Sequence, residues 1–174
     1  MCKKELIDLL KNCEAIKFGN FILTSGESSD YYIDIKKAIT DPIVLNKITK
    51  KIAKYSTNYD LIAGMELGAV PLIVALSLET KIPYVIIRKT KRTHGTSKQI
   101  EGGNVKDKKI LIIEDVTTSG GSVIETIKIL KKQNAILDKV IVVVDRENGA
   151  NKKIENLNLK LIPLLSISEI INNK

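Results

Sequence analysis

Short apolar runs that alternate with helical segments limit the fold of this chain more than any other feature. Four such runs, rich in isoleucine, leucine and valine, lie at residues 61–63, 84–87, 110–113 and 140–144. A strand that is apolar at every position has both faces covered, which is typical of a parallel sheet. Helical segments over residues 68–79 and 122–133 give strand–helix–strand order, which requires right-handed crossovers. The sequence therefore predicts an α/β fold in which helices flank a central, mostly parallel sheet.

The remaining segments surround this alternation. Periodicity and capping signals predict helices over residues 3–15, 42–55 and 168–171, and strands over residues 21–23, 31–35 and 159–165. The helix at 42–55 has the clearest start, because Asp41 is a good N-cap and Pro42 suits the first helical turn. We expect residues 1–40 to form a small N-terminal hood and residues 41–174 to form the core of a single structural domain.

Length and composition exclude several classes of protein. A chain of 174 residues suits one domain with a sizeable core. No stretch approaches the roughly 18 apolar residues of a membrane helix, and the start of the chain has no apolar signal region. Two cysteines, Cys2 and Cys13, cannot make a disulfide framework, and no metal-ligand spacing surrounds them. We therefore expect a cytoplasmic protein that does not bind a membrane.

The positive charge of the chain is concentrated in one segment. The formal net charge is +8, which over a uniform surface would favour nucleic acid as a partner. However, residues 88–98 contain five lysine and arginine side chains and no carboxylate. Such a cluster favours a compact anion, such as a polyphosphate, and a solvated loop is the alternative. We do not expect nucleic acid to be the partner.

The strongest functional signal follows the apolar run at residues 110–113. Two adjacent carboxylates, Glu114 and Asp115, come directly after it, and hydroxyl residues and glycines then lead into the helix at 122–133. Because ligands bind beyond the carboxyl ends of parallel strands, this loop is well placed for binding. Glycines allow a ligand to approach the backbone, and a helix N-terminus offers free N–H groups that suit a phosphate.

The two carboxylates narrow the class of ligand. They would repel a phosphate, but they accept hydrogen bonds from sugar hydroxyls. A ribose 5-phosphate satisfies both parts of the segment, which lacks the lysine of a P-loop and the glycine spacing of a dinucleotide-binding turn. A plain strand–turn–helix connection with a capping serine is the alternative, and the adjacent acids argue against it.

Residues 112–120 resemble the phosphoribosyl-pyrophosphate motif of the type I phosphoribosyltransferases. Other segments narrow the resemblance to the orotate phosphoribosyltransferases. Residues 21–34 resemble that family's orotate-side segment, and residues 64–72 resemble its pyrophosphate loop. Residues 88–102 resemble its catalytic loop, and residues 145–146 resemble the segment with its substrate arginine. The matches follow the family order from residue 18 to residue 149.

This resemblance implies an activity, a cofactor and an assembly. The activity is transfer of the 5-phosphoribosyl group from phosphoribosyl pyrophosphate to orotate, which gives orotidine 5′-phosphate and pyrophosphate in de novo pyrimidine (UMP) biosynthesis. The cofactor is Mg²⁺, held largely by substrate and water, with no protein ligand assigned. The assembly is a homodimer in which the basic loop reaches the neighbouring subunit's site. The alternatives are a phosphoribosyltransferase for another base and a non-catalytic regulator that senses phosphoribosyl pyrophosphate.

The resemblance also assigns site residues. The catalytic residues, which neutralise pyrophosphate, are Arg88, Lys89, Arg92 and His94. The phosphoribosyl-pyrophosphate-binding residues are Glu114, Asp115, Val116, Thr117, Thr118, Ser119, Gly120, Gly121 and Ser122. The orotate-binding residues are Thr118 and Arg146.

Several assignments have alternatives or depart from the family pattern. Arg146 could instead form an ion pair with Asp145 or Glu147, and the neighbouring tyrosines at 31 and 32 either shield the base or pack in the core. Arg92 stands where the family commonly has lysine, with a lysine beside it at 91. Thr24 and Gly68 stand where many members have a lysine.

Overall fold

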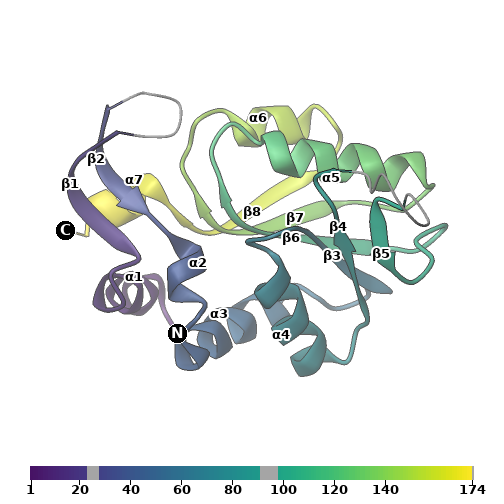
Figure 1. The fold of residues 1–174 in the computed structure, drawn as a ribbon, viewed down its shortest axis with the longest axis horizontal. Helices are drawn as coiled ribbons and strands as arrows, with labels where there is room; N and C mark the ends of the chain where they lie inside the picture. The colour runs from purple at the N-terminus through teal and green to yellow at the C-terminus, as the bar shows by residue number, and fades with distance from the viewer. Residues whose placement is uncertain (23–27, 91–97, 174) are drawn as a thin grey trace.

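The central sheet contains six strands within the residues that the computed structural model describes, which are 1–22, 28–90 and 98–173 (Figure 1). The strands are β3 (Leu61–Met65), β4 (Tyr84–Ile87), β5 (Ile100–Gly102), β6 (Ile110–Thr117), β7 (Lys139–Asp145) and β8 (Lys160–Ser166). Their spatial order is β5-β4-β3-β6-β7-β8, and every neighbouring pair is parallel except β4 with β5. The predicted α/β class, with a mostly parallel sheet, is confirmed.

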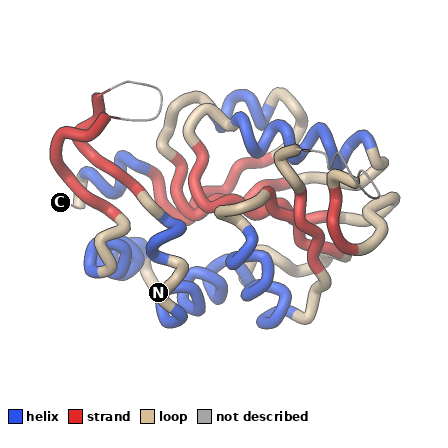
Figure 2. Tube along the Cα trace, viewed as in Figure 1, coloured by secondary structure: helices blue, strands red, loops and turns tan. Residues whose placement is uncertain are grey.

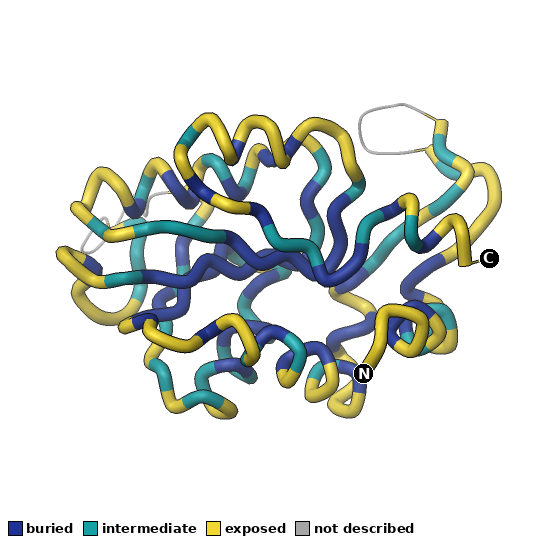
Figure 3. Tube along the Cα trace, turned by 180° about the vertical axis from the view of Figure 1, so that it is seen from behind, coloured by how far each residue is buried: buried dark blue, intermediate teal, exposed yellow. Residues whose placement is uncertain are grey.

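Helices cover both faces of this sheet (Figure 2). On one face lie α3 (Pro42–Ala53) and α4 (Val70–Thr80), and on the other lie α5 (Gly121–Lys132) and α6 (Ala150–Glu155). Successive side chains of β6 point to opposite faces of the sheet. Leu111 and Ile113 pack in the apolar cluster on the side of α3 and α4, and Ile110 and Ile112 pack in the cluster on the side of α5 and α6. The central strands are therefore buried on both faces, as their continuous apolar runs predict (Figure 3).

The helix predicted at residues 42–55 begins where its capping residues indicate. The Asp41 carboxylate accepts hydrogen bonds from the backbone N–H groups of Ile43 and Val44, at 2.7 Å and 3.3 Å, and α3 starts at Pro42. Helix α1 (Lys3–Asn12) ends three residues earlier than predicted, because Glu14 adopts a left-handed backbone with φ of 56°. None of the helices among the described residues is long and apolar enough to span a membrane.

The two ends of the chain meet beside the sheet. After α1, strands β1 (Ile16–Ile22) and β2 (Ser28–Ile33) form an antiparallel hairpin, followed by the short helix α2 (Ile35–Ala38). The last helix, α7 (Ile167–Ile171), packs its buried Ile167 and Ile170 into the same apolar cluster as Leu6 of α1. The division of the chain at residue 40 stays a prediction, because one core joins the first helix to the last.

The bounds of several strands also differ from the sequence-based prediction. Strand β1 begins at Ile16, five residues before the strand predicted at 21–23. Residues 31–35 were expected to be one strand, but Ile35 begins α2 because the Asp34 side chain caps that helix by accepting a hydrogen bond from the Lys37 N–H at 3.2 Å. The strand expected at 110–113 continues to Thr117, because its ladder with β7 continues as far as the Thr117–Asp145 pair. The acidic pair that follows residue 113 therefore lies within β6 and not in a loop.

Candidate active site

The acidic pair lies in the second half of β6, the central strand of the site. Glu114 and Asp115 are both buried, at 5% and 8% exposure. The Glu114 carboxyl accepts a hydrogen bond from the Ser122 hydroxyl at 2.9 Å and another from the Asp115 backbone N–H at 3.2 Å. The first bond joins the strand to the beginning of α5, so the two halves of the predicted ribose-phosphate segment are in direct contact.

Burial and proximity change the protonation of this pair. Burial above all, and then the negative charge of Asp115, raise the pKa of Glu114 to about 8, while the Ser122 hydroxyl acts in the opposite direction. Near neutral pH Glu114 therefore keeps its proton. The pair can then both donate and accept hydrogen bonds, which suits neighbouring sugar hydroxyls.

Gly68 packs directly against the Asp115 carboxylate. A Cβ atom at residue 68 would lie 2.2 Å from Asp115 Oδ2, closer than any real side chain approaches. In this chain the loop that connects β3 to α4 therefore approaches Asp115 so closely that a side chain at residue 68 would have to displace the carboxylate or the loop. This contact gives a physical reason for the glycine that stands where many family members have lysine.

The N-terminus of α5 is open for an anion. Gly120, in a left-handed conformation with φ of 84°, is the N-cap, and no side chain in the described part of the chain caps the helix. The first backbone N–H groups of the helix therefore lack partners within it, which is the usual phosphate-binding arrangement. Residues 116–119 lead from the acidic pair to this helix end, and the Ser119 carbonyl accepts a hydrogen bond from the Lys153 ammonium at 3.0 Å.

Arg146 lies at the end of β7, next to this segment. Its backbone N–H donates to the Thr117 carbonyl at 2.9 Å, and its guanidinium lies 5.2 Å from the ring centroid of Tyr31. Its Nε is buried and has no hydrogen-bond partner among the described residues. The salt bridges of those residues include none between Arg146 and Asp145 or Glu147, so the structure does not support the ion-pair alternative.

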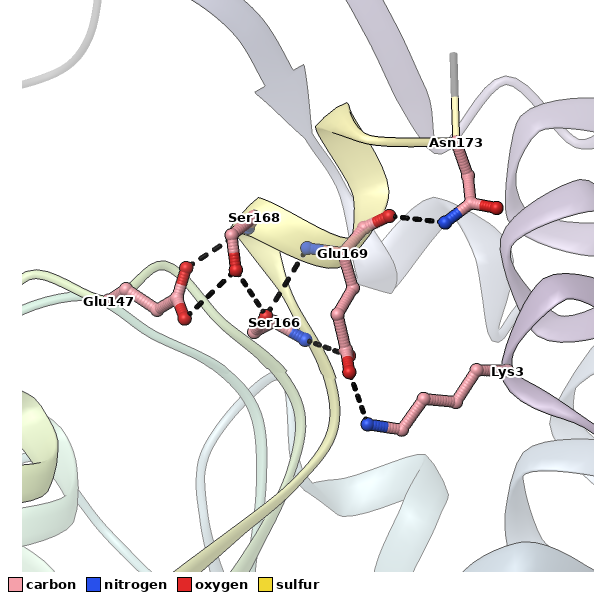
Figure 4. A network of polar contacts seen from close by, with 6 residues as sticks. All are labelled: Lys3, Glu147, Ser166, Ser168, Glu169 and Asn173. Atoms are coloured by element: carbon pink, nitrogen blue, oxygen red, sulfur yellow. Dashed lines mark hydrogen bonds and ion pairs between the residues drawn. The ribbon is translucent and has the colours of Figure 1, made fainter.

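A polar network holds the loop that carries Arg146 (Figure 4). The Glu147 carboxylate accepts hydrogen bonds from the Ser168 backbone N–H and hydroxyl, at 3.0 Å and 3.1 Å. Ser168 belongs to α7, whose Glu169 forms an ion pair with Lys3 of α1. The last helix thus connects the end of β7 to the first helix of the chain.

The basic segment begins at the end of β4, on the same edge of the sheet. Arg88 Nη1 lies 3.5 Å from Glu101 Oε1 of β5, and the Lys89 N–H donates to Glu66 Oε1 at 3.0 Å. The predicted catalytic residues Arg92 and His94 lie outside the described residues, as does Thr24 of the orotate-side segment. The structure therefore places two of the four predicted loop residues.

One charged contact in the site was not predicted from the sequence. Lys36 of α2 places its ammonium 3.8 Å from Asp115 Oδ2. No local pattern distinguishes it from Lys37, because only the packing of α2 beside β6 brings residue 36 to the acidic pair. Within the described residues, no three histidine, cysteine or acidic side chains gather to hold a metal ion.

The sequence is similar to those of known proteins over nearly its whole length. Residues 36–162 match the family described as phosphoribosyl transferase domain. The orotate phosphoribosyltransferase of Pyrococcus horikoshii is 52% identical over 97% of this chain and 92% of its own length, and that of Methanocaldococcus jannaschii is 45% identical over 97% and 96%.

The fold is also similar to that of a solved structure from the same family. The crystal structure of orotate phosphoribosyltransferase from Aeropyrum pernix superposes with a TM-score of 0.85 at 25% identity, over 96% of each chain. Sequence similarity over nearly the full length and the shared fold therefore agree: this chain belongs to the orotate phosphoribosyltransferase family.

Proposed function

We propose that this protein transfers the 5-phosphoribosyl group from phosphoribosyl pyrophosphate to orotate, giving orotidine 5′-phosphate and pyrophosphate in pyrimidine biosynthesis. The observation that carries the proposal is the contact between the buried pair Glu114–Asp115 and the uncapped N-terminus of α5 through Ser122. Arg88 and Arg146, which directly follow the nearby strands β4 and β7, add positive charge at the same edge of the sheet.

The phosphoribosyl group binds at the end of β6. Its 5-phosphate accepts hydrogen bonds from the backbone and hydroxyl groups of residues 117–122, at the positive end of the α5 dipole. Its ring hydroxyls lie at the acidic pair, where Asp115 accepts and protonated Glu114 donates. The negative charge there also favours the positive charge that develops on the ribose ring in the transition state.

The bond broken is the one between the anomeric carbon and the pyrophosphate oxygen. Its electron pair leaves with pyrophosphate, a ring nitrogen of orotate supplies the pair for the new bond to that carbon, and the proton of that nitrogen is released to the departing pyrophosphate or to water. The leaving group gains negative charge, so nearby cations lower the barrier. Arg88 and Lys89 supply such charge, and Arg92 and His94 of the same segment are proposed to do so as well.

Orotate binds next to β7. Its carboxylate and carbonyl oxygens are acceptors that match the forked donors of an arginine. Arg146 is proposed to fill this role, because its Nε is buried without a partner in the described chain and its guanidinium lies over Tyr31. The Thr118 side chain is proposed to contact the same base.

The remaining proposals concern the cofactor, the assembly and the location. The family resemblance supports a Mg²⁺ ion that would arrive with its substrate, since this metal prefers phosphate oxygens and water to a full protein cage. When bound, the ion supplies positive charge to the pyrophosphate oxygens. The family resemblance supports a homodimer that shares the basic loop, and a cytoplasmic location.

A panel of bases tests the proposed function. Purified protein is mixed with phosphoribosyl pyrophosphate and Mg²⁺ and given orotate, uracil, hypoxanthine or adenine in separate reactions, and loss of each base is followed by chromatography. We expect consumption of orotate and none of the other three. Consumption of another base at a higher rate would assign the enzyme to that base, and no turnover by folded protein would contradict the catalytic assignment.

A further inference from the structure

Lys36 belongs to the hood, yet it reaches the centre of the site. It is one of two successive lysines in α2, and this helix is fixed by Ile35 and Ala38, both of which are fully buried. The Lys36 ammonium lies 3.8 Å from Asp115 Oδ2, whereas the Lys37 ammonium lies 2.7 Å from Glu14 Oε2, away from the site. The helix therefore directs two chemically identical side chains to different acids.

Asp115 is held from two directions. On one side its carboxylate packs against Gly68, which leaves no room even for a methyl group. On the other side it meets Lys36, which is the one cation within 4.0 Å of either member of the acidic pair among the described residues. Burial removes the water that would otherwise solvate a carboxylate, and a cation at this distance compensates for part of that loss.

We propose that Lys36 is a positioning residue: it holds the Asp115 carboxylate in the orientation that meets the ribose hydroxyls of phosphoribosyl pyrophosphate. This inference rests on the proposed function. It gives the hood a second role, because the same segment that contacts Arg146 through Tyr31 also sets the geometry of the phosphoribosyl site. The Lys36 side chain is 59% exposed, so this ion pair contributes little to folding stability.

Matched lysine variants test the proposal. The variants are Lys36→Met, which removes the charge and keeps the length, Lys36→Arg, which keeps the charge, and Lys37→Met, which removes the neighbouring charge that faces Glu14. Steady-state kinetics give KM for each substrate, and calorimetric titration with phosphoribosyl pyrophosphate and Mg²⁺, without any base, gives its affinity directly.

The expected result is a selective loss. Lys36→Met raises KM and Kd for phosphoribosyl pyrophosphate about tenfold and changes KM for orotate less than about twofold, as expected for a lost contact at one substrate only. Lys36→Arg keeps both constants within about threefold of the wild type. Lys37→Met matches the wild type, and all variants unfold at the wild-type temperature.

Three results would overturn the proposal. They are an unchanged Kd for phosphoribosyl pyrophosphate in Lys36→Met, an equal rise in KM for both substrates, and an equal effect of Lys37→Met. The titration needs no orotate, so it separates this inference from the assignment of the base. If orotate were not a substrate, the affinity of the lysine variants for phosphoribosyl pyrophosphate would still decide the role of Lys36.

Discussion

At the residue scale, the closest contact in the site is between Gly68 and Asp115. A Cβ atom at residue 68 would lie only 2.2 Å from the carboxylate, so a side chain there must displace Asp115 or the loop itself. A carboxylate that is moved by about 1 Å no longer meets the ribose hydroxyls in the right geometry. Glycine at this position therefore allows the close approach of the loop to Asp115 in this chain.

The variant Gly68→Ala tests this requirement. We expect kcat/KM for phosphoribosyl pyrophosphate to fall about 100-fold, because displacement of a binding group by this much has such an effect on rate. Gly103→Ala is the matched control, since a Cβ atom at residue 103 would meet no heavy atom within 4 Å. A Gly68→Ala enzyme with wild-type kinetics would show that the acidic pair tolerates displacement.

Glu114 connects the site to the pH dependence of folding. Its pKa is about 8 in the folded protein, mainly because of burial, against an ordinary value of 4.5. Between these two values the folded protein binds the proton more tightly than the unfolded chain does. The free energy of unfolding contributed by this group is therefore fully present below about pH 4.5 and is lost as the pH rises through about 8.

The variant Glu114→Gln removes this titration. Urea unfolding of the wild type at several pH values from 5 to 9 is expected to show a free energy of unfolding that decreases with pH, and the variant is expected to show a shallower decrease. Gln keeps an acceptor for the Ser122 hydroxyl, so the native contact survives. Equal slopes for the two proteins would mean that Glu114 does not titrate in this range.

At the element scale, α7 forms hydrogen bonds to the loop that follows β7. Ser168 donates two hydrogen bonds to Glu147, the residue after Arg146. We expect Ser168→Ala to raise KM for orotate about threefold, because loss of one bond loosens the arginine loop, and to lower the free energy of unfolding by at most about 1 kcal/mol. Kinetics and urea unfolding measure the two effects.

A matched control separates these effects. Ser56→Ala removes a buried hydroxyl that donates to the Ala53 carbonyl at 2.7 Å, at the end of α3 and away from β7. It should lower stability by a comparable amount, since Ser56→Ala loses one hydroxyl bond and the exposed Ser168 hydroxyl loses its bonds to Glu147 and Ser166, and it should leave KM for orotate unchanged. If both variants changed KM for orotate equally, the support from α7 would have no special effect on Arg146.

The elements that were predicted well are those with a local cause. The apolar runs at β3, β4 and β7 predict buried strands because their side chains are apolar at consecutive positions. Asp41 and Pro42 predict the start of α3. The three-residue strand β5 has too short a pattern to predict, and it is a strand only because it pairs with β4. The length of β6 likewise depends on its partner β7.

At the scale of the whole molecule, the site joins segments that are distant in the sequence. The contiguous segment at residues 114–122 could be predicted because its residues are neighbours in the chain and their chemistry is complementary. The contacts of Asp115 with Lys36 and Gly68 could not, because they exist only after the hood and the β3–α4 loop have packed against β6. The charge cluster at 88–98 could be recognised from its content of basic residues alone, but its position in the fold could not be predicted. The structure places its first two residues at the edge of the sheet.

The most direct test of the central claim follows all phosphorus atoms of the reaction. Wild-type protein, Mg²⁺ and phosphoribosyl pyrophosphate are observed by phosphorus NMR with and without orotate. We predict that one orotidine 5′-phosphate and one pyrophosphate appear for each phosphoribosyl pyrophosphate consumed, and only when orotate is present. Unchanged phosphoribosyl pyrophosphate, or its hydrolysis to ribose 5-phosphate at a rate that does not depend on orotate, would contradict the account.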